Sequence, residues 1–212
     1  MTLDRFFPPE ARERVARAVR EAEARSLSQI VPVVVERSGR YDEVPWIGGV
    51  LLAAVATAAI EVARLEVALW ELPVLQLAAG ILGALLSRLD PVERLFAGKG
   101  DLDQTTRDRA LRAFVENGLH RTAHGTGVLV FASLLEHRAH ILGDHGIHQK
   151  MGDEGWQRGV EALVAGIRRG EPAAGFCDAI GLVGATLAEH FPRPGGAAAP
   201  NELPDELRGT RT

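Results

Sequence analysis

Histidine side chains are concentrated in one part of this sequence and are the first residues that could do chemistry. Six of the seven histidines fall between His120 and His148, and neutral imidazole is a ligand for zinc and other transition metals. The spacing disfavours a metal site, because His137 and His140 would project from opposite faces of one predicted strand. His120 and His124 could share a helix face, but the glycines around them predict a loop. We therefore expect surface or hydrogen-bonded histidines.

His120 and Arg121 form a candidate catalytic pair beside the start of a predicted strand. An imidazole next to a guanidinium could receive an anionic group. The alternative is that Arg121 pairs with a carboxylate such as Glu116 and has no role in binding. The sequence leaves both interpretations open.

Common catalytic motifs are missing. Gly125-Thr126-Gly127 is glycine-rich, but it precedes a strand and lacks the helix N-terminus that binds phosphate in phosphate loops. There is no nucleophile elbow and no His-Glu-x-x-His pair. The sole cysteine, Cys177, lies beside Phe176 and Ile180 in a helical pattern, which predicts a packed thiol. A single cysteine forms no intramolecular disulfide, in agreement with a reducing compartment.

The charge balance excludes one class of function. The net charge is −4, with basic and acidic residues interspersed, so no basic stripe is available for nucleic acid and we expect no nucleic-acid partner. Met1 to Ser28 follows a charged helical pattern, which is not that of a secretory signal peptide.

Two apolar runs, Val44 to Ile60 and Leu72 to Ser87, interrupt this charged sequence. The first has no charge and one polar residue, Thr57, whereas a surface helix would show a polar stripe. Extended as Trp46 to Leu65 and Val67 to Ser87, the runs reach about 30 Å each, enough to cross a bilayer. We therefore predict a transmembrane helical hairpin. The alternative is a helical hairpin buried in a large soluble core.

Small residues of the hairpin fit this prediction, whereas four charged residues stand against it. Small residues let helices in lipid approach closely; they are Gly48, Gly49, Ala53 and Ala56 in the first run and Ala79, Gly80, Gly83 and Ala84 in the second. Four charged residues fall where the helices join, namely Glu61, Arg64, Glu66 and Glu71. At the membrane interface they cost little, whereas at the bilayer centre each would cost about 2.5–3.5 kcal/mol.

Basic residues predict the orientation, because positive charge near the spans stays on the cytoplasmic side. The outer ends of the two spans carry Arg37, Arg40, Arg88, Arg94 and Lys99, whereas the turn offers only Arg64. We therefore expect a multi-pass protein of the inner (plasma) membrane, with both termini and the soluble domain in the cytoplasm and the lipid bilayer as its first partner.

The remaining sequence predicts an α/β fold with a small mixed β-sheet flanked by helices. Helical periodicity predicts helices over Glu10–Ser26, Asp101–Asn117, Asp153–Arg169 and Ala173–His190. A short β-branched run predicts a strand over Ile30–Val35, and two further strands, joined by a turn around Leu135 and Glu136, are predicted over Gly127–Ser133 and Arg138–Leu142. Pro32 predicts an edge strand or a bulge, and Gly118 a left-handed helix cap. The predicted organisation is a domain in two halves, 1–43 and 89–192, a hairpin over 44–88 and a flexible tail over 193–212.

Several motifs resemble one family. They are Gly118-Leu119-His120-Arg121-Thr122, Gly127-Val128-Leu129-Val130-Phe131-Ala132-Ser133-Leu134, Asp144-His145-Gly146-Ile147, Glu21-Ala22-Glu23-Ala24-Arg25, Ala188-Glu189-His190-Phe191-Pro192 and Asn201-Glu202-Leu203-Pro204-Asp205. Their order resembles the TPM domain family, and in particular its bacterial "predicted membrane protein" branch with two transmembrane segments. The resemblance implies an α/β sheet with helices on both sides. It links the chain to acid phosphatase activity, calcium binding, or assembly and repair of membrane complexes.

The resemblance also implies a metal site. Aligned with the family's acidic stretch, Asp144 and Asp153 are the candidate ligands for a divalent cation, calcium or magnesium, although His148 replaces a glutamate and calcium prefers several oxygen ligands. The alternatives are that Asp153 is a helix N-cap and Asp144 a turn residue between Gly143 and Gly146. No cofactor is required by the sequence.

Two functions follow as expectations. The first is a membrane-anchored, non-catalytic binding or assembly module at the cytoplasmic face of the membrane, with a membrane or envelope protein as its partner. The second is a weak metal-dependent phosphatase acting on phosphate esters, with Asp144, Asp153, His120 and Arg121 at its site.

Overall fold

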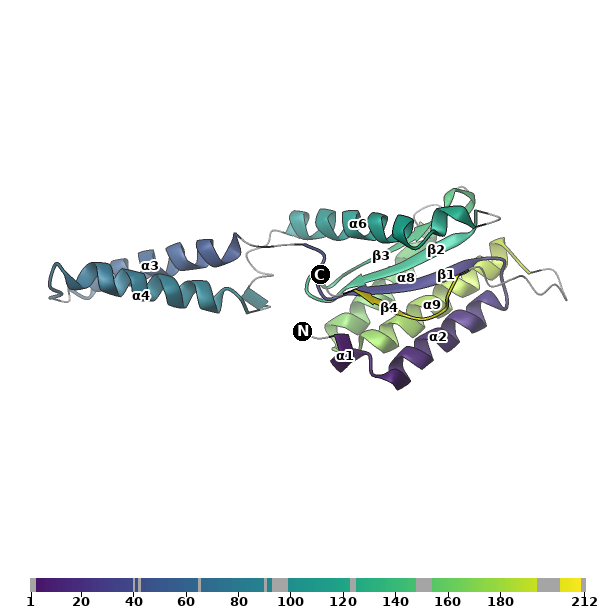
Figure 1. The fold of residues 1–212 in the computed structure, drawn as a ribbon, viewed down its shortest axis with the longest axis horizontal. Helices are drawn as coiled ribbons and strands as arrows, with labels where there is room; N and C mark the ends of the chain where they lie inside the picture. The colour runs from purple at the N-terminus through teal and green to yellow at the C-terminus, as the bar shows by residue number, and fades with distance from the viewer. Residues whose placement is uncertain are drawn as a thin grey trace. The chain divides into compact units, whose positions relative to one another are not determined.

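The computed structural model describes residues 3–39, 41, 43–64, 66–89, 91–92, 99–122, 125–147, 154–193 and 203–210. The chain divides into two compact units, one formed by Met1–Gly39 with Leu102–Thr212 and the other by Arg40–Asp101. In chain order the elements are α1 (Leu3–Phe6), α2 (Pro9–Glu23), β1 (Gln29–Val35), α3 (Val44–Val62), α4 (Glu71–Leu86), α6 (Lys99–Glu116), the 3₁₀ turn η1 (Leu119–Arg121), β2 (Gly127–Ser133), β3 (Arg138–Gly143), α8 (Glu154–Arg168), α9 (Pro172–His190) and β4 (Arg208–Thr210) (Figure 1).

The four strands form one mixed sheet in the order β3-β2-β1-β4. β1 is parallel to β2 and to β4, whereas β2 and β3 are antiparallel neighbours. Ile30 pairs with Val128 and Val35 with Ser133. The predicted mixed α/β class and the predicted β2–β3 hairpin are therefore confirmed. The β1–β2 pairing also confirms that one sheet is built from sequence on both sides of the apolar hairpin.

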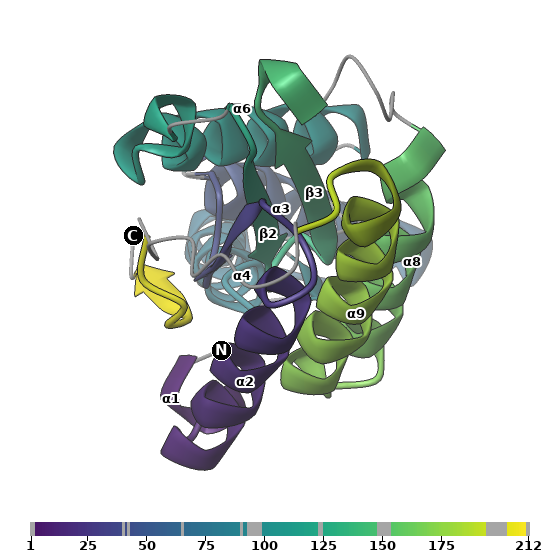
Figure 2. The same cartoon turned by 90° about the vertical axis from the view of Figure 1, so that its right-hand side faces the viewer.

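Helices cover both faces of this sheet (Figure 2). On one face, α2, α8 and α9 pack on β1 and β2 through a cluster that includes Val15, Ile30, Val130 and Phe176. On the other face, α6 packs through a second cluster that includes Val33. Strands that are covered on both sides have no polar face. This explains why β1 and β2 are almost continuously apolar.

Pro32 corrects one expectation. β1 is an internal strand between β2 and β4, so the predicted edge position is wrong. Backbone N–H groups alternate between the two sides of a strand, and Gln29 donates its N–H to the Thr126 carbonyl on the β2 side at 3.1 Å. The Pro32 nitrogen therefore faces the β4 side, where β4 pairs only with Val33 to Val35. Proline removes no hydrogen bond from the sheet there.

Glu136 fixes the point where the chain leaves β1. This buried carboxylate lies in the turn between β2 and β3 and accepts hydrogen bonds from the backbone N–H groups of Ser38 at 2.8 Å and Gly39 at 3.3 Å. It also accepts one from the Ser133 hydroxyl. The two units are therefore joined by a segment that is hydrogen-bonded to the first unit up to Gly39.

The helical hairpin is confirmed, but its extended ends are wrong. α3 has 19 residues and α4 has 16, which correspond to about 28 and 24 Å. The chain turns at Arg64, whose φ of 49° is left-handed, and Val67 lies in the non-helical connection. Leu65 lies outside the described residues. Among the described helices, α3 is the one long and apolar enough to qualify as a membrane span, and α4 is a shorter apolar helix.

Short elements complete the fold. α1, η1 and β4 were not expected, and β4 falls within the segment predicted as a flexible tail. Gly118 has a φ of 72°, which confirms the left-handed cap after α6. The other predicted helices are confirmed to within a few residues at their ends.

Candidate functional site

The surface of the α3–α4 hairpin is apolar and exposed. Only 17% of the α3 window is buried, so the hairpin is not the buried core element that the alternative interpretation requires. Its exposed side chains include Trp46, Val50, Val55, Val62, Trp70, Val74, Leu77, Ile81 and Leu85. An apolar surface of this kind indicates a protein or membrane contact.

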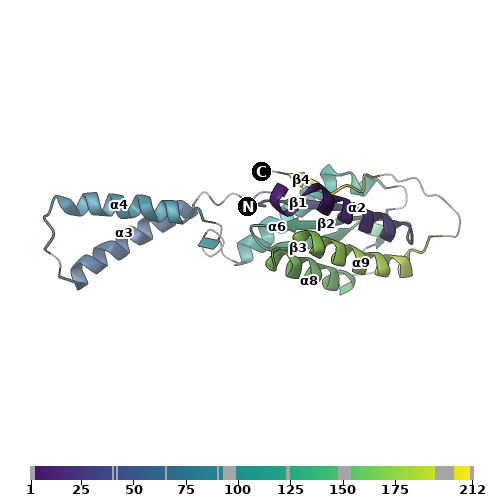
Figure 3. The ribbon, with the colours of Figure 1, turned by 90° about the horizontal axis from the view of Figure 1, so that it is seen from below.

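Glycines hold the two helices together at one end of the hairpin. A Cβ built on Gly49 would lie 2.9 Å from the carbonyl oxygen of Gly80, and one on Gly83 would collide with the carbonyl oxygen of Gly48. The backbones therefore touch where four small residues face one another. Figure 3 shows α3 and α4 diverging from this end toward the loop that connects them.

One polar pair joins the helices closer to the connecting loop. Gln76 donates a hydrogen bond from Nε2 to the Thr57 hydroxyl oxygen at 3.1 Å, and the Thr57 hydroxyl donates to the Ala53 carbonyl oxygen at 3.0 Å. Thr57 is the uncharged polar residue of α3 and Gln76 that of α4, and the two are hydrogen-bonded to each other. Interhelical hydrogen bonds between such residues are typical of helices packed in lipid.

Tryptophans lie at the two ends of the hairpin. Trp46 is in the first turn of α3 and is 79% exposed, and Trp70 precedes α4 and is 72% exposed. Because α3 and α4 run in opposite directions, these positions are about one helix length apart. Tryptophan is enriched at both membrane interfaces. The charged residues Glu61, Arg64 and Glu71 lie at the Trp70 end, outside the apolar part.

Asp144 lies where β3 ends. Its N–H donates to the Gly127 carbonyl at 2.8 Å, its Oδ1 accepts from the His145 N–H at 2.7 Å, and its carbonyl accepts from the Ile147 N–H at 2.9 Å. This is the geometry of a hydrogen-bonded turn. Asp153 and His148 lie outside the described residues. Across the described ranges, no three His, Cys, Asp or Glu side chains gather in a way that could hold a metal ion.

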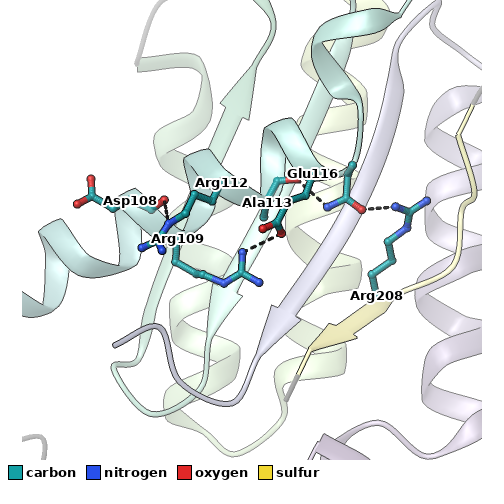
Figure 4. A network of polar contacts seen from close by, with 7 residues as sticks. Asp108, Arg109, Arg112, Ala113, Glu116 and Arg208 are labelled. Atoms are coloured by element: carbon teal, nitrogen blue, oxygen red, sulfur yellow. Dashed lines mark hydrogen bonds and ion pairs between the residues drawn. The ribbon is translucent and has the colours of Figure 1, made fainter. Parts of the chain in front are cut away.

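His120 and Arg121 lie on η1, before β2. Both are exposed, and Arg121 Nε donates to His120 Nε2 at 3.1 Å. Glu116, the expected alternative partner, instead pairs with Arg109 at 3.1 Å (Figure 4). The candidate pair is therefore held together by its own hydrogen bond at the surface.

The C-terminal end of α6 is tied to the last strand. The Asn117 side chain donates to the Ala113 carbonyl at 2.7 Å and accepts a hydrogen bond from the Arg208 guanidinium. On the outer side of the helix, Arg112 donates to the Asp108 carbonyl at 3.3 Å (Figure 4). These polar contacts join α6 and β4 at the surface and do not form a catalytic group.

Burial shifts the pKa of two residues, His140, which was expected to be a surface or hydrogen-bonded histidine, and Cys177, which was expected to be a packed thiol. Burial lowers the pKa of His140, which lies under α6, with Arg107 and Arg138 acting in the same direction and Asp103 opposing them. Burial raises the pKa of the Cys177 thiol, which lies in α9 against the core. The packed-thiol interpretation of Cys177 is consistent with this environment.

Glu23 is a buried titratable residue that sequence reasoning missed. It is 7% exposed at the end of α2, and its carboxylate accepts a hydrogen bond from the Ile30 N–H at 2.6 Å. Burial raises its pKa to about 7, the Ile30 hydrogen bond lowers it, and Asp205 and Arg193 have smaller opposing effects. Its neighbours in sequence are alternately charged, so nothing in the pattern singled it out.

Gln76 was also missed, although a signal was present. It is the one uncharged polar residue of α4 before Ser87, as Thr57 is of α3. In an antiparallel hairpin joined near residue 66, these two positions fall at the same level. Counting residues from the turn would have paired them.

Comparisons with known proteins agree with this architecture. The NMR structure of BA42 protein from the psychrophilic bacterium Bizionia argentinensis is similar in fold, with a TM-score of 0.61, 18% sequence identity and coverage of 99% of each chain. No curated protein sequence matches this chain significantly. The family model described as the TPM domain matches residues 96–186, from α6 through most of α9. The resemblance to the TPM domain is therefore confirmed over residues 96–186.

Proposed function

We propose that this chain is a membrane-anchored TPM-domain protein of the two-transmembrane branch and serves as a non-catalytic binding or assembly module. The observation that carries the proposal is the exposed apolar surface of the α3–α4 hairpin, with tryptophans at both ends. A soluble protein would leave this surface in water at a large cost in free energy. In a bilayer the same side chains contact lipid.

Both termini and the α/β domain are assigned to the cytoplasmic side of the inner (plasma) membrane. Support comes from Arg37 and Arg88 at the outer ends of the hairpin, because the turn offers only Arg64. α4 is short for a bilayer, but helices shorter than the hydrocarbon thickness are accommodated by local thinning.

Cysteine accessibility tests the anchor and its orientation. In a Cys177→Ser background, Glu66→Cys should react with a membrane-impermeant maleimide from outside intact cells, whereas Arg37→Cys should react only after the inner membrane is opened. Alkaline carbonate should leave the protein in the membrane pellet. Release by carbonate, or equal labelling at both positions in intact cells, would refute this topology.

The assembly role is tested by isolating the full chain from membranes in a mild detergent after chemical crosslinking. A membrane or envelope protein should co-purify in a constant ratio. A chain that always emerges without any crosslinked protein would contradict a role in assembly.

A metal-dependent phosphatase is the second candidate, favoured by the match of residues 96–186, which include Asp144, to the TPM domain family model. Asp153, His120 and Arg121 complete the proposed site, which would take calcium or magnesium. The detergent-solubilised chain should then hydrolyse a phosphate ester only with added cation. Activity that survives both Asp144→Ala and Asp153→Ala would remove this site assignment.

A further inference from the structure

Only part of the hydrogen-bonding capacity of the Gln76 carboxamide is satisfied within the hairpin. A glutamine side chain has two N–H donors and a carbonyl oxygen with two lone pairs. Among the described residues, Gln76 makes one side-chain hydrogen bond, through a single N–H to Thr57. The Thr57 hydroxyl proton is already donated to the Ala53 carbonyl. One N–H and the carbonyl oxygen of Gln76 are left over, on a side chain that is exposed.

Gln76 lies inside the apolar segment and not at its end. It follows Glu71 by five residues and precedes Ser87 by eleven, or about 8 and 17 Å along the helix. Its exposed neighbours Leu75 and Leu77 are apolar. The hydrogen bond to Thr57 directs the carboxamide toward α3.

Hydrocarbon offers no partner for the unused groups. In water they would be hydrated, but lipid tails neither donate nor accept hydrogen bonds, and an amide without a partner is costly there. α3 and α4 diverge toward the connecting loop (Figure 3), and the Gln76 side chain is exposed and so accessible to another helix.

We propose that the hairpin binds a second copy of this chain through Gln76, an inference that rests on the membrane location proposed above. A carboxamide carries its donor and acceptor side by side, so two of them are complementary and form two hydrogen bonds with each other. Copies inserted in the same direction bring Gln76 to the same depth, and a twofold axis along the membrane normal makes the contact identical from both sides. A different protein would need a matching donor and acceptor at this depth.

Energy transfer in lipid vesicles tests the contact. Full-length chains that carry a donor or acceptor fluorescent protein after Thr212 are reconstituted together and diluted with lipid. We expect a dimer whose dissociation is reversible on dilution. Gln76→Leu, which keeps the size and removes both hydrogen bonds, should weaken dimerisation about tenfold, since each such bond contributes modestly in membranes.

Two further variants separate the contact from the internal packing of the hairpin. Leu77→Ala, at the adjacent exposed position, should leave dimerisation within twofold of the unmodified chain. Thr57→Val removes the internal partner of Gln76 and leaves its carboxamide free to pair, so the dimer should persist. A loss with Thr57→Val equal to that with Gln76→Leu would assign the effect to folding of the hairpin and overturn the proposal.

The proposed membrane location and the proposed dimer are refuted by different results. If alkaline carbonate releases the chain from the vesicles, the membrane location is refuted and the dimer with it. If the chain stays in the pellet and shows no energy transfer at any lipid ratio, the dimer alone is refuted.

Discussion

The Glu23 carboxylate lies 2.6 Å from the backbone nitrogen of Ile30 and accepts its hydrogen bond. The Ile30 N–H points to the β4 side of β1, at a position beyond the end of β4, which pairs only with Val33 to Val35. The Glu23 side chain, at the end of α2, thus accepts the hydrogen bond that a neighbouring strand would otherwise accept at this point. It does so as a buried acid, with consequences for stability.

Stability should fall as the pH rises through the titration of Glu23. Burial raises its pKa from the ordinary 4.5 to about 7, so the folded chain holds this proton more tightly than the unfolded chain. The stabilisation is complete below pH 4.5 and is lost progressively up to pH 7 and just above. Its size is about 3 kcal/mol. Urea unfolding of the detergent-solubilised chain at a series of pH values measures it.

A matched pair of variants isolates that effect. Glu23→Gln keeps an acceptor for the Ile30 N–H and removes the titration, so this contribution to the pH dependence should disappear. Glu21→Gln, at an exposed position of the same helix, should leave it unchanged. Equal slopes for Glu23→Gln and the unmodified chain would show that another group is responsible.

His140 should affect stability in the opposite direction, so that the free energy of unfolding falls as the pH is lowered. Burial lowers its pKa below the ordinary 6.5, so the unfolded chain binds this proton more readily. The contribution of His140 is present above pH 6.5 and is lost as the pH falls through and below that value. His140→Gln should therefore flatten the fall in unfolding free energy below pH 6.5. Exposed His190→Gln serves as the control, and an unchanged acid limb in His140→Gln would contradict the assignment.

The glycine contact of the hairpin gives an asymmetric prediction for two similar substitutions. Gly49→Ala places a Cβ 2.9 Å from the Gly80 carbonyl and should destabilise the hairpin by about 1–3 kcal/mol. In Gly80→Ala the new Cβ meets the Gly49 carbonyl at an ordinary 3.7 Å. This change should be neutral, or stabilising by up to about 1 kcal/mol through helix propensity. Thermal unfolding in detergent, followed by helical circular dichroism, compares them; equal losses would refute the contact.

The hydrogen bond from Arg208 to Asn117 should govern how firmly β4 is held. Asn117→Ala removes the acceptor and should lower the free energy of opening of β4 by about 1 kcal/mol. Hydrogen exchange at 208–210 would then be roughly fivefold faster. Arg112→Ala, which loses only a contact on the outer side of α6, should leave exchange of β4 unaltered. Unchanged exchange in Asn117→Ala would show that strand pairing alone holds β4.

The elements that the sequence predicts well are those with a strong local pattern. β1 is a β-branched run and β2 is a mostly apolar one, because both are buried on both faces of the sheet, so they were expected with almost the observed ends. β4 is the opposite case. Arg208-Gly209-Thr210 has no apolar pattern, and its strand conformation comes only from pairing with Val33 to Val35.

The same contrast applies to the candidate site. The left-handed φ of Arg64 has no sequence signature, so the helix ends near the turn were misplaced. Glu23 is buried because β1 packs against the end of α2. This tertiary contact cannot be predicted from the periodicity of α2 alone. The pairing of Thr57 and Gln76 could have been predicted, because both are isolated polar residues at about equal distances in sequence from one turn.

The parallel pairing of β1 with β2 sets an order of events during synthesis. Val35 leaves the ribosome about 90 residues before Gly127, which is a delay of roughly 5–20 seconds at ordinary elongation rates. Throughout that interval β1 has neither of its strand neighbours, while the whole apolar hairpin is being made. The hairpin is therefore complete before the sheet can form, and until then β1 is an unpaired, aggregation-prone segment.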